Sequence, residues 1–152
     1  MLTLWFKLVV KKEMQGECFL VNFADDFVAG FQYKSEAERC YKELKERMEK
    51  FGLELESSKS RLIEFGRFEE QNRRARGEHK PETFDFLGFT FYCSKNRKGG
   101  FAPKVQTSRK KFEQKVRAYK NWIYDNRNRP MREIIKELNV KLIGHYRYYG
   151  VT

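Results

Sequence analysis

Apolar residues in the first part of the chain repeat with two different periods. Over residues 2–13 they lie three or four apart, which predicts an N-terminal helix. Two short β-prone runs follow, at residues 18–23 and 27–31, and the polar turn Ala24-Asp25-Asp26 separates them. This pattern predicts a hairpin with two carboxylates at its tip. The expected buried face of the helix carries Leu2, Trp5, Phe6, Val9 and Val10.

A second helical period covers residues 35–51. Ser35 and Glu38 have the spacing of a capping box, with Ser35 as the N-cap, and Gly52 is expected to end the helix. Beyond it, residues 53–55 and 61–65 are apolar and β-prone, which predicts two short strands.

The middle of the chain changes from charged to β-prone sequence. Residues 67–82 lack apolar periodicity and are expected to form a mobile charged loop. Residues 84–92 predict a strand, and the Lys98-Gly99-Gly100 sequence predicts a hairpin turn before a further strand at residues 101–105.

The last part of the sequence is helical in pattern. Ser108 is expected to cap a helix with apolar residues at Phe112, Val116, Tyr119 and Ile123. Residues 126–129 predict a break, and Pro130 at a first-turn position predicts the start of another helix. The expected fold class is therefore α+β, with one domain over residues 1–106 and a helical domain over residues 107–152.

Charge is distributed very unevenly along the 152 residues. The net charge is +11, but residues 1–58 carry 9 Lys/Arg against 11 Asp/Glu, whereas residues 59–152 carry 23 against 10. With 40% hydrophobic residues the chain is expected to fold. The one-sided positive charge indicates an anionic partner for the second part.

The number and spacing of the cysteines argue against both a zinc site and a disulfide framework. Cys18, Cys40 and Cys93 are odd in number and widely spaced, and only His79 and His145 could act as imidazole partners. This spacing does not suit a zinc site or a disulfide framework and indicates the reducing cytoplasm. The apolar N-terminal stretch is too short to cross a bilayer, so no membrane partner is expected.

The chemistry-bearing feature is the Asp25-Asp26 pair. Adjacent carboxylates on a tight turn suit Mg²⁺, which prefers carboxylate oxygens, and two such metals can promote phosphoryl transfer. The alternative is that the two aspartates only help to form the turn, because aspartate is common in turns. A third, weaker hypothesis is a metal-dependent nuclease that uses only these two aspartates.

Several motifs decide between these alternatives. The sequence Phe23-Ala24-Asp25-Asp26 resembles the Tyr/Phe-Ala-Asp-Asp signature of reverse transcriptases. In the family's order there follow residues 51–55, then Lys59 before residues 62–66, then residues 84–89. The helical stretch 134–142 and residues 143–150 are similar to the end of the thumb in bacterial group II intron reverse transcriptases.

The resemblance implies a role for each motif. Asp25 and Asp26 would be catalytic and bind Mg²⁺, with Mn²⁺ as an alternative metal, on a palm hairpin. Lys59 would lie near the phosphates of the incoming nucleotide, and Phe86, Leu87 and Gly88 would contact nucleic acid as a primer-grip hairpin. The family also uses a palm aspartate from an earlier strand, but none of the 24 residues before Asp25 is Asp.

Cations of the second part are expected to neutralise nucleic-acid phosphates with little sequence preference. Most aromatic residues there are expected to be core, although tyrosines near the end, including Tyr146, Tyr148 and Tyr149, could stack on bases. The basic residues singled out on the first helix of the helical domain are Arg109, Lys110, Lys115, Arg117 and Lys120.

The leading hypothesis is the palm and thumb portion of a group II intron type RNA-directed DNA polymerase, inactive by itself. Its partners would be an RNA template and a DNA primer, with intron RNA as a further candidate. The alternative is a non-catalytic nucleic-acid-binding module from a truncated or degenerate reverse transcriptase. The palm surface that packs on the upstream half of a complete polymerase would be exposed, and this exposed surface is expected to cause self-association.

Overall fold

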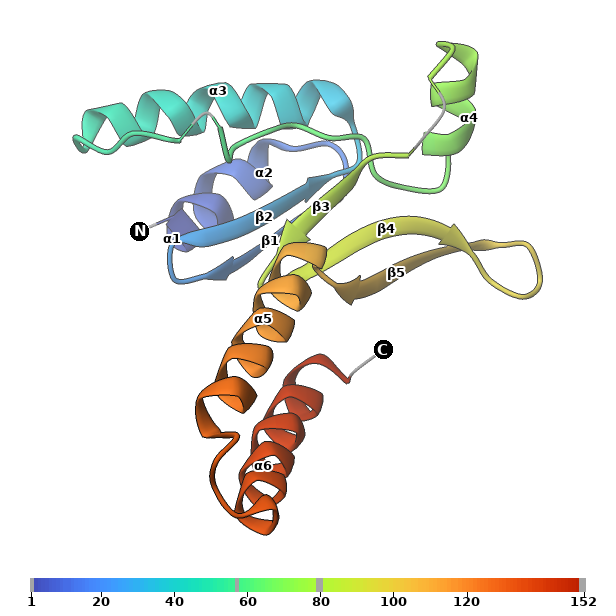
Figure 1. The fold of residues 1–152 in the computed structure, drawn as a ribbon. Coiled ribbons are helices and arrows are strands. Elements are labelled where there is room, and N and C mark those ends of the chain that lie inside the picture. The colour runs from blue at the N-terminus through green and yellow to red at the C-terminus, as the bar shows by residue number, and fades with distance from the viewer. Residues whose placement is uncertain (1, 57, 79–80, 151–152) are drawn as a thin grey trace. The chain divides into compact units, whose positions relative to one another are not determined.

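A computed structural model describes residues 2–56, 58–78 and 81–150. The chain forms two compact units, Met1–Glu64 and Phe65–Thr152, each with helices and a small antiparallel sheet. This architecture confirms the α+β class (Figure 1). The division at residue 64 is one of packing, and the expected functional boundary at residue 106 stays a prediction. In the described part of the chain no helix is long and apolar enough to cross a membrane.

The first unit begins with one continuous helical segment of three parts, α1 (Leu2–Trp5), η1 (Phe6–Val10) and α2 (Lys11–Glu13). Trp5, Phe6 and Val10 are buried as expected, but Val9 is 40% exposed, so its predicted burial was wrong. The cause is that η1 is a π-helix, whose wider turn rotates Val9 away from the core face.

The hairpin of β1 (Cys18–Phe23) and β2 (Asp26–Phe31) packs against this helix with one face. Side chains alternate between the faces of a strand, so the register Cys18↔Phe31 places both residues on the core side. Leu20, Phe27 and Ala29 share that side. The predicted hairpin is therefore confirmed, and its core face is apolar.

Helix α3 (Lys34–Lys50) covers the same face and contributes buried Cys40 and Leu44. It begins one residue before Ser35, after Tyr33, without a side-chain cap, so the expected capping box was wrong. Its end is as predicted. Gly52 has a φ of 68°, and the Leu53 amide donates to the Met48 carbonyl at 2.9 Å, the bond that defines a Schellman motif.

Residues 53–55 and 61–65 are not strands, so both predictions were wrong. β-Propensity describes how well a side chain fits a pleated surface, and a strand also needs a hydrogen-bonded neighbour. Among the described residues, neither segment takes a place in a sheet.

The second unit opens with an element that periodicity did not predict. Helix α4 (Glu69–Ala75) occupies part of the expected charged loop. It is held by ion pairs: Arg73 contacts Glu69, Glu78 and Glu82, and Glu69 is only 3% exposed. Ion pairs thus stabilise α4, whereas most helices are stabilised by burial of an apolar face. Residues 79–80 of that expected loop, including His79, lie outside the described part.

The predicted strand over residues 84–92 is in fact two strands. β3 (Thr83–Phe86) and β4 (Phe89–Lys95) pair antiparallel, and the Leu87-Gly88 turn joins them. β4 pairs in turn with β5 (Phe101–Thr107), which confirms the second hairpin. A two-residue turn inside an apolar run leaves the β-prone pattern almost unbroken, so the pattern missed the turn, whereas the likeness to a primer-grip hairpin implied it.

The chain ends in two antiparallel helices, α5 (Arg109–Asn126) and α6 (Met131–Tyr149) (Figure 1). Ser108 caps α5 as predicted, because its Oγ accepts from the Lys111 amide. Pro130 is the N-cap of α6 and not a first-turn residue. The helices are tied together by the Tyr119 hydroxyl, which donates to the Lys141 carbonyl at 3.1 Å.

Candidate active site and nucleic-acid surface

The carboxylate pair lies at a two-residue turn. Phe23 and Asp26 are the last paired residues of the β1–β2 ladder, so Ala24 and Asp25 form the turn itself. Ala24 has a φ of 51°, which residues other than glycine rarely adopt, and the Asn22 side chain donates to the Ala24 carbonyl at 3.4 Å. Unusual backbone at a hairpin tip commonly accompanies a functional site.

Both aspartates are exposed at this tip. Asp26 begins β2 and lies on the face opposite the core, because its neighbour Phe27 packs inward. Strand alternation places Phe19, Val21 and Phe23 on the same outward face as Asp26, and they are 59%, 47% and 63% exposed. The acidic tip therefore adjoins a bare apolar sheet face.

The donor set at the tip fits Mg²⁺ in part. Mg²⁺ keeps several waters and is usually bound by one or two carboxylates together with substrate phosphates, so Asp25 and Asp26 are suitable ligands. Within the described ranges, however, no three His, Cys, Asp or Glu side chains gather as a metal-binding group. The pair is thus a partial site that needs further oxygen ligands.

Lys59 belongs to the same unit as the aspartates. Its ammonium lies 2.6 Å from Glu56, with both side chains exposed. This hydrogen bond raises the pKa of Lys59, and the nearby charge of Asp26 raises it further. Lys59 is therefore cationic and close enough to Asp26 for the two charges to interact, and its expected role near phosphates stays a prediction.

The expected nucleic-acid residues lie in the second unit. Phe86 ends β3, and the Leu87-Gly88 turn has left-handed φ angles of 53° and 82°. Two adjacent positive φ angles are the signature of a type I′ turn, the tightest hairpin connection. Asp85 accepts a hydrogen bond from the Thr90 side chain across the strand pair, so this carboxylate helps to hold the two strands together.

Helix α5 gathers four of its five expected cations on one face. At 3.6 residues per turn, Arg109, Lys110, Arg117 and Lys120 fall within an arc of about 100°. Lys115 lies elsewhere, with its ammonium 5.8 Å from the Tyr119 ring centre.

One acid, Glu113, shares the basic arc of α5. It forms a 2.8 Å ion pair with Arg109. This pairing lowers the pKa of Glu113, and Arg117 lowers it further. The basic face thus has an internal counterion next to two of its cations.

Two of the tyrosines proposed for base stacking make contacts within the second unit, although Tyr148 is still 53% exposed. Tyr148 stacks on Phe89 with ring centres 5.7 Å apart, and its hydroxyl donates to the Leu87 carbonyl at 3.0 Å. Tyr149 packs on Phe89 at 5.2 Å. Tyr146 is 65% exposed and stays a candidate for stacking. Sequence reasoning missed the bracing role of Tyr148 and Tyr149 because it joins residues 61 positions apart.

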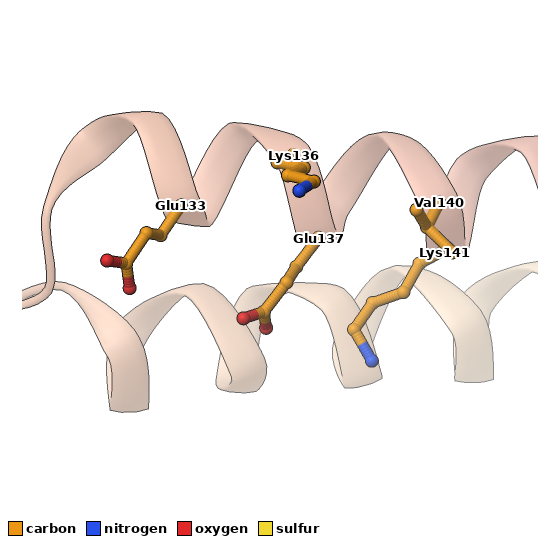
Figure 2. Close-up of a pocket in the computed structure, with 5 residues that line it drawn as sticks. All are labelled: Glu133, Lys136, Glu137, Val140 and Lys141. Carbon is orange, nitrogen blue, oxygen red and sulfur yellow. The ribbon is translucent and has the colours of Figure 1, made fainter.

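A shallow hollow along α6 is a different surface. Its lining is mixed in charge, and Figure 2 shows Glu133, Glu137 and Lys141 pointing to the same side of the helix. Glu137 pairs with Arg129 at 2.5 Å, and the Lys141 ammonium lies 5.1 Å from the Trp122 ring centre. Glu137 thus ties α6 to the loop that precedes it, and Lys141 ties α6 to α5. The full lining is Glu133, Lys136, Glu137, Val140 and Lys141.

Comparison with known proteins adds the last observation. Residues 4–91, more than half of the chain, match the family model described as reverse transcriptase (RNA-dependent DNA polymerase). Neither the curated proteins nor the solved structures yielded a match. The matched range contains the acidic hairpin, Lys59 and the Leu87-Gly88 turn. This chain belongs to the reverse transcriptase family.

Proposed function

We propose that the chain is the palm and thumb portion of a group II intron type reverse transcriptase, which extends a DNA primer on an RNA template. The observation that carries this proposal is the pair of exposed carboxylates on a two-residue hairpin turn inside the family match. The group II type rests on the likeness of residues 134–150 to the end of that family's thumb.

Asp25 and Asp26 would hold Mg²⁺, or Mn²⁺ in its place, through their exposed carboxylates. The bound metal would stabilise charge on the attacking and leaving oxygens of phosphoryl transfer. Lys59 supports this role electrostatically, since its ammonium stays protonated at neutral pH and can offset negative charge on nucleotide phosphates.

The second unit would bind the nucleic-acid backbone. The basic face of α5 carries four cations, of which Arg109 is paired with Glu113, and the Leu87-Gly88 turn offers an uncharged contact for the primer strand. Such binding has little sequence preference and weakens steeply with salt. Intron RNA would use the same face.

Catalysis by these residues would depend on a further carboxylate. Two-metal sites need more ligands than two adjacent aspartates provide, and no Asp precedes Asp25 in the 152-residue sequence. We therefore propose that the chain alone does not extend primers. The bare apolar side chains of Phe19, Val21 and Phe23 would then favour self-association of the isolated chain.

Primer extension with a complementing partner tests this proposal. A polypeptide that carries the fingers and the further palm aspartate is mixed with the chain, an RNA template, a DNA primer, deoxynucleotides and Mg²⁺. Extension should require both polypeptides, and Asp25→Ala should abolish it. Extension that survives Asp25→Ala would refute the assignment of the metal site.

The second candidate function is a non-catalytic nucleic-acid-binding module. The partial ligand set at the hairpin favours it, because the described residues hold no three-ligand cluster. It predicts salt-dependent binding to nucleic acid with no extension under any complementation. The same assay thus separates the two functions.

A further inference from the structure

The Leu87-Gly88 turn is attached to the start of α5 and to the end of α6, and these contacts form a junction between the turn and the helical pair. The Gly88 carbonyl accepts from the Ser108 amide at 2.9 Å, and Ser108 is the buried cap of α5. The neighbouring Leu87 carbonyl accepts from the Tyr148 hydroxyl near the end of α6 at 3.0 Å. Two consecutive carbonyls of one turn are therefore bonded to two different helices.

Aromatic packing closes the same junction. Phe89, directly after the turn, contacts the Tyr148 and Tyr149 rings. Tyr149 also packs on His145, with ring centres 4.8 Å apart. The junction thus has partly exposed aromatic contacts in addition to its hydrogen bonds.

Space at Gly88 is limited by the same tyrosine. A Cβ atom added there would lie 2.9 Å from the Tyr149 hydroxyl, and the φ of 82° already disfavours any side chain. The turn and α6 are in close contact: glycine suits the backbone angle, and a Cβ atom at this position would force the Tyr149 side chain to shift.

We propose that Tyr148 and Tyr149 are positioning residues that hold the Leu87-Gly88 turn at a fixed distance from the basic face of α5, so that one nucleic-acid duplex contacts both. This inference rests on the proposed function, in which both surfaces bind the same duplex. Two surfaces at a fixed spacing bind a duplex more tightly than either surface alone, because the second surface binds intramolecularly once the first has bound. Loosening the junction weakens binding although no cation is lost.

Gly88→Ala loosens the junction, and Gly99→Ala is its matched control. Gly99 has the same φ of 82°, but among the described residues no atom lies within 4 Å of a Cβ built there. Both variants therefore carry the same backbone penalty, and only Gly88→Ala collides with Tyr149. Tyr149→Phe removes the hydroxyl that causes the collision and keeps the ring, so it should rescue Gly88→Ala.

The experiment measures the affinity of the full chain for an RNA/DNA heteroduplex with a recessed DNA 3′ end, over a range of salt concentrations. Gly88→Ala should weaken binding about tenfold with an unchanged salt slope, since the α5 cations remain. Gly99→Ala should stay within about twofold of the unchanged chain, and Gly88→Ala with Tyr149→Phe should recover most of the loss.

Tyr148→Phe is the second variant, in case Gly88→Ala does not fold. It removes one hydroxyl and should weaken binding about threefold at an unchanged slope, because a single hydrogen bond is lost. Equal affinities of Gly88→Ala and Gly99→Ala, or of Tyr148→Phe and the unchanged chain, overturn the inference alone. An unchanged chain without salt-dependent binding overturns the proposed function and this inference together.

Discussion

Replacing two cations of α5 gives a quantitative prediction. Arg117 and Lys120 are exposed on the basic arc, and glutamine has a similar helix propensity, so Arg117→Gln with Lys120→Gln should leave the fold intact. Each lost phosphate contact makes the plot of log affinity against log salt less steep by about 0.9, so the double substitution should make it less steep by about 1.8. The unchanged chain should therefore lose about 12-fold more affinity than the variant when salt rises fourfold.

Fluorescence anisotropy with a labelled RNA/DNA heteroduplex measures both slopes. The matched control is Lys42→Gln with Lys45→Gln, two exposed lysines of α3 in the first unit, which should leave the slope unchanged. Equal slopes for the α5 variant and the unchanged chain would refute the assignment of this face to phosphate binding.

Glu113→Gln should have the opposite effect on the same plot. It releases Arg109 from its 2.8 Å ion pair and removes the acid on the basic arc. One further cation becomes available, so the slope should steepen by about 0.9 and low-salt affinity should rise. A weaker or unchanged slope would show that Arg109 does not face the nucleic acid.

Three predictions concern stability, each measured by denaturant unfolding. Val10→Ala, at a side chain with 0% exposure, should cost about 2–3 kcal/mol, whereas Val9→Ala should cost less than about 1 kcal/mol; equal costs would contradict the π-helical register. Ser108→Ala should cost about 1 kcal/mol, since it removes the α5 cap; no change would contradict the cap. Burial raises the pKa of the Cys40 thiol from 9.0 to about 11. The stability that depends on the protonated thiol is therefore complete below pH 9, and up to about 2–3 kcal/mol of the free energy of unfolding is lost as the pH rises to 11. Cys40→Ala should flatten this alkaline decline, and an unchanged decline would contradict the attribution.

Local signals in the sequence were sufficient where one segment determines its own structure. The β1–β2 hairpin followed from two apolar runs around a polar turn, and the end of α3 followed from Gly52, whose φ of 68° few other residues adopt. The site residues Asp25 and Asp26 could be singled out for the same reason, because their turn and their chemistry lie within four consecutive residues.

Elements that depend on distant partners could not be predicted in this way. Helix α4 is held by ion pairs of Arg73 and not by an apolar stripe, so periodicity gave no signal. The bracing of the Leu87-Gly88 turn by Tyr148 joins residues of the second unit that are 61 positions apart. Residues 53–55 have strand-like side chains and no place in a sheet, because pairing depends on neighbours and not only on propensity.

Binding of a divalent cation at the β1–β2 tip is the central claim, and paramagnetic broadening by Mn²⁺ tests it most directly. In amide NMR spectra of the full chain, Mn²⁺ should broaden the signals of residues 23–27 first, and Asp25→Asn should remove this preference. Exposed Glu46 and Glu49 of α3 report nonspecific binding to surface carboxylates. Broadening that is as strong around these two glutamates as at the hairpin, or that is unchanged by Asp25→Asn, would contradict the metal site.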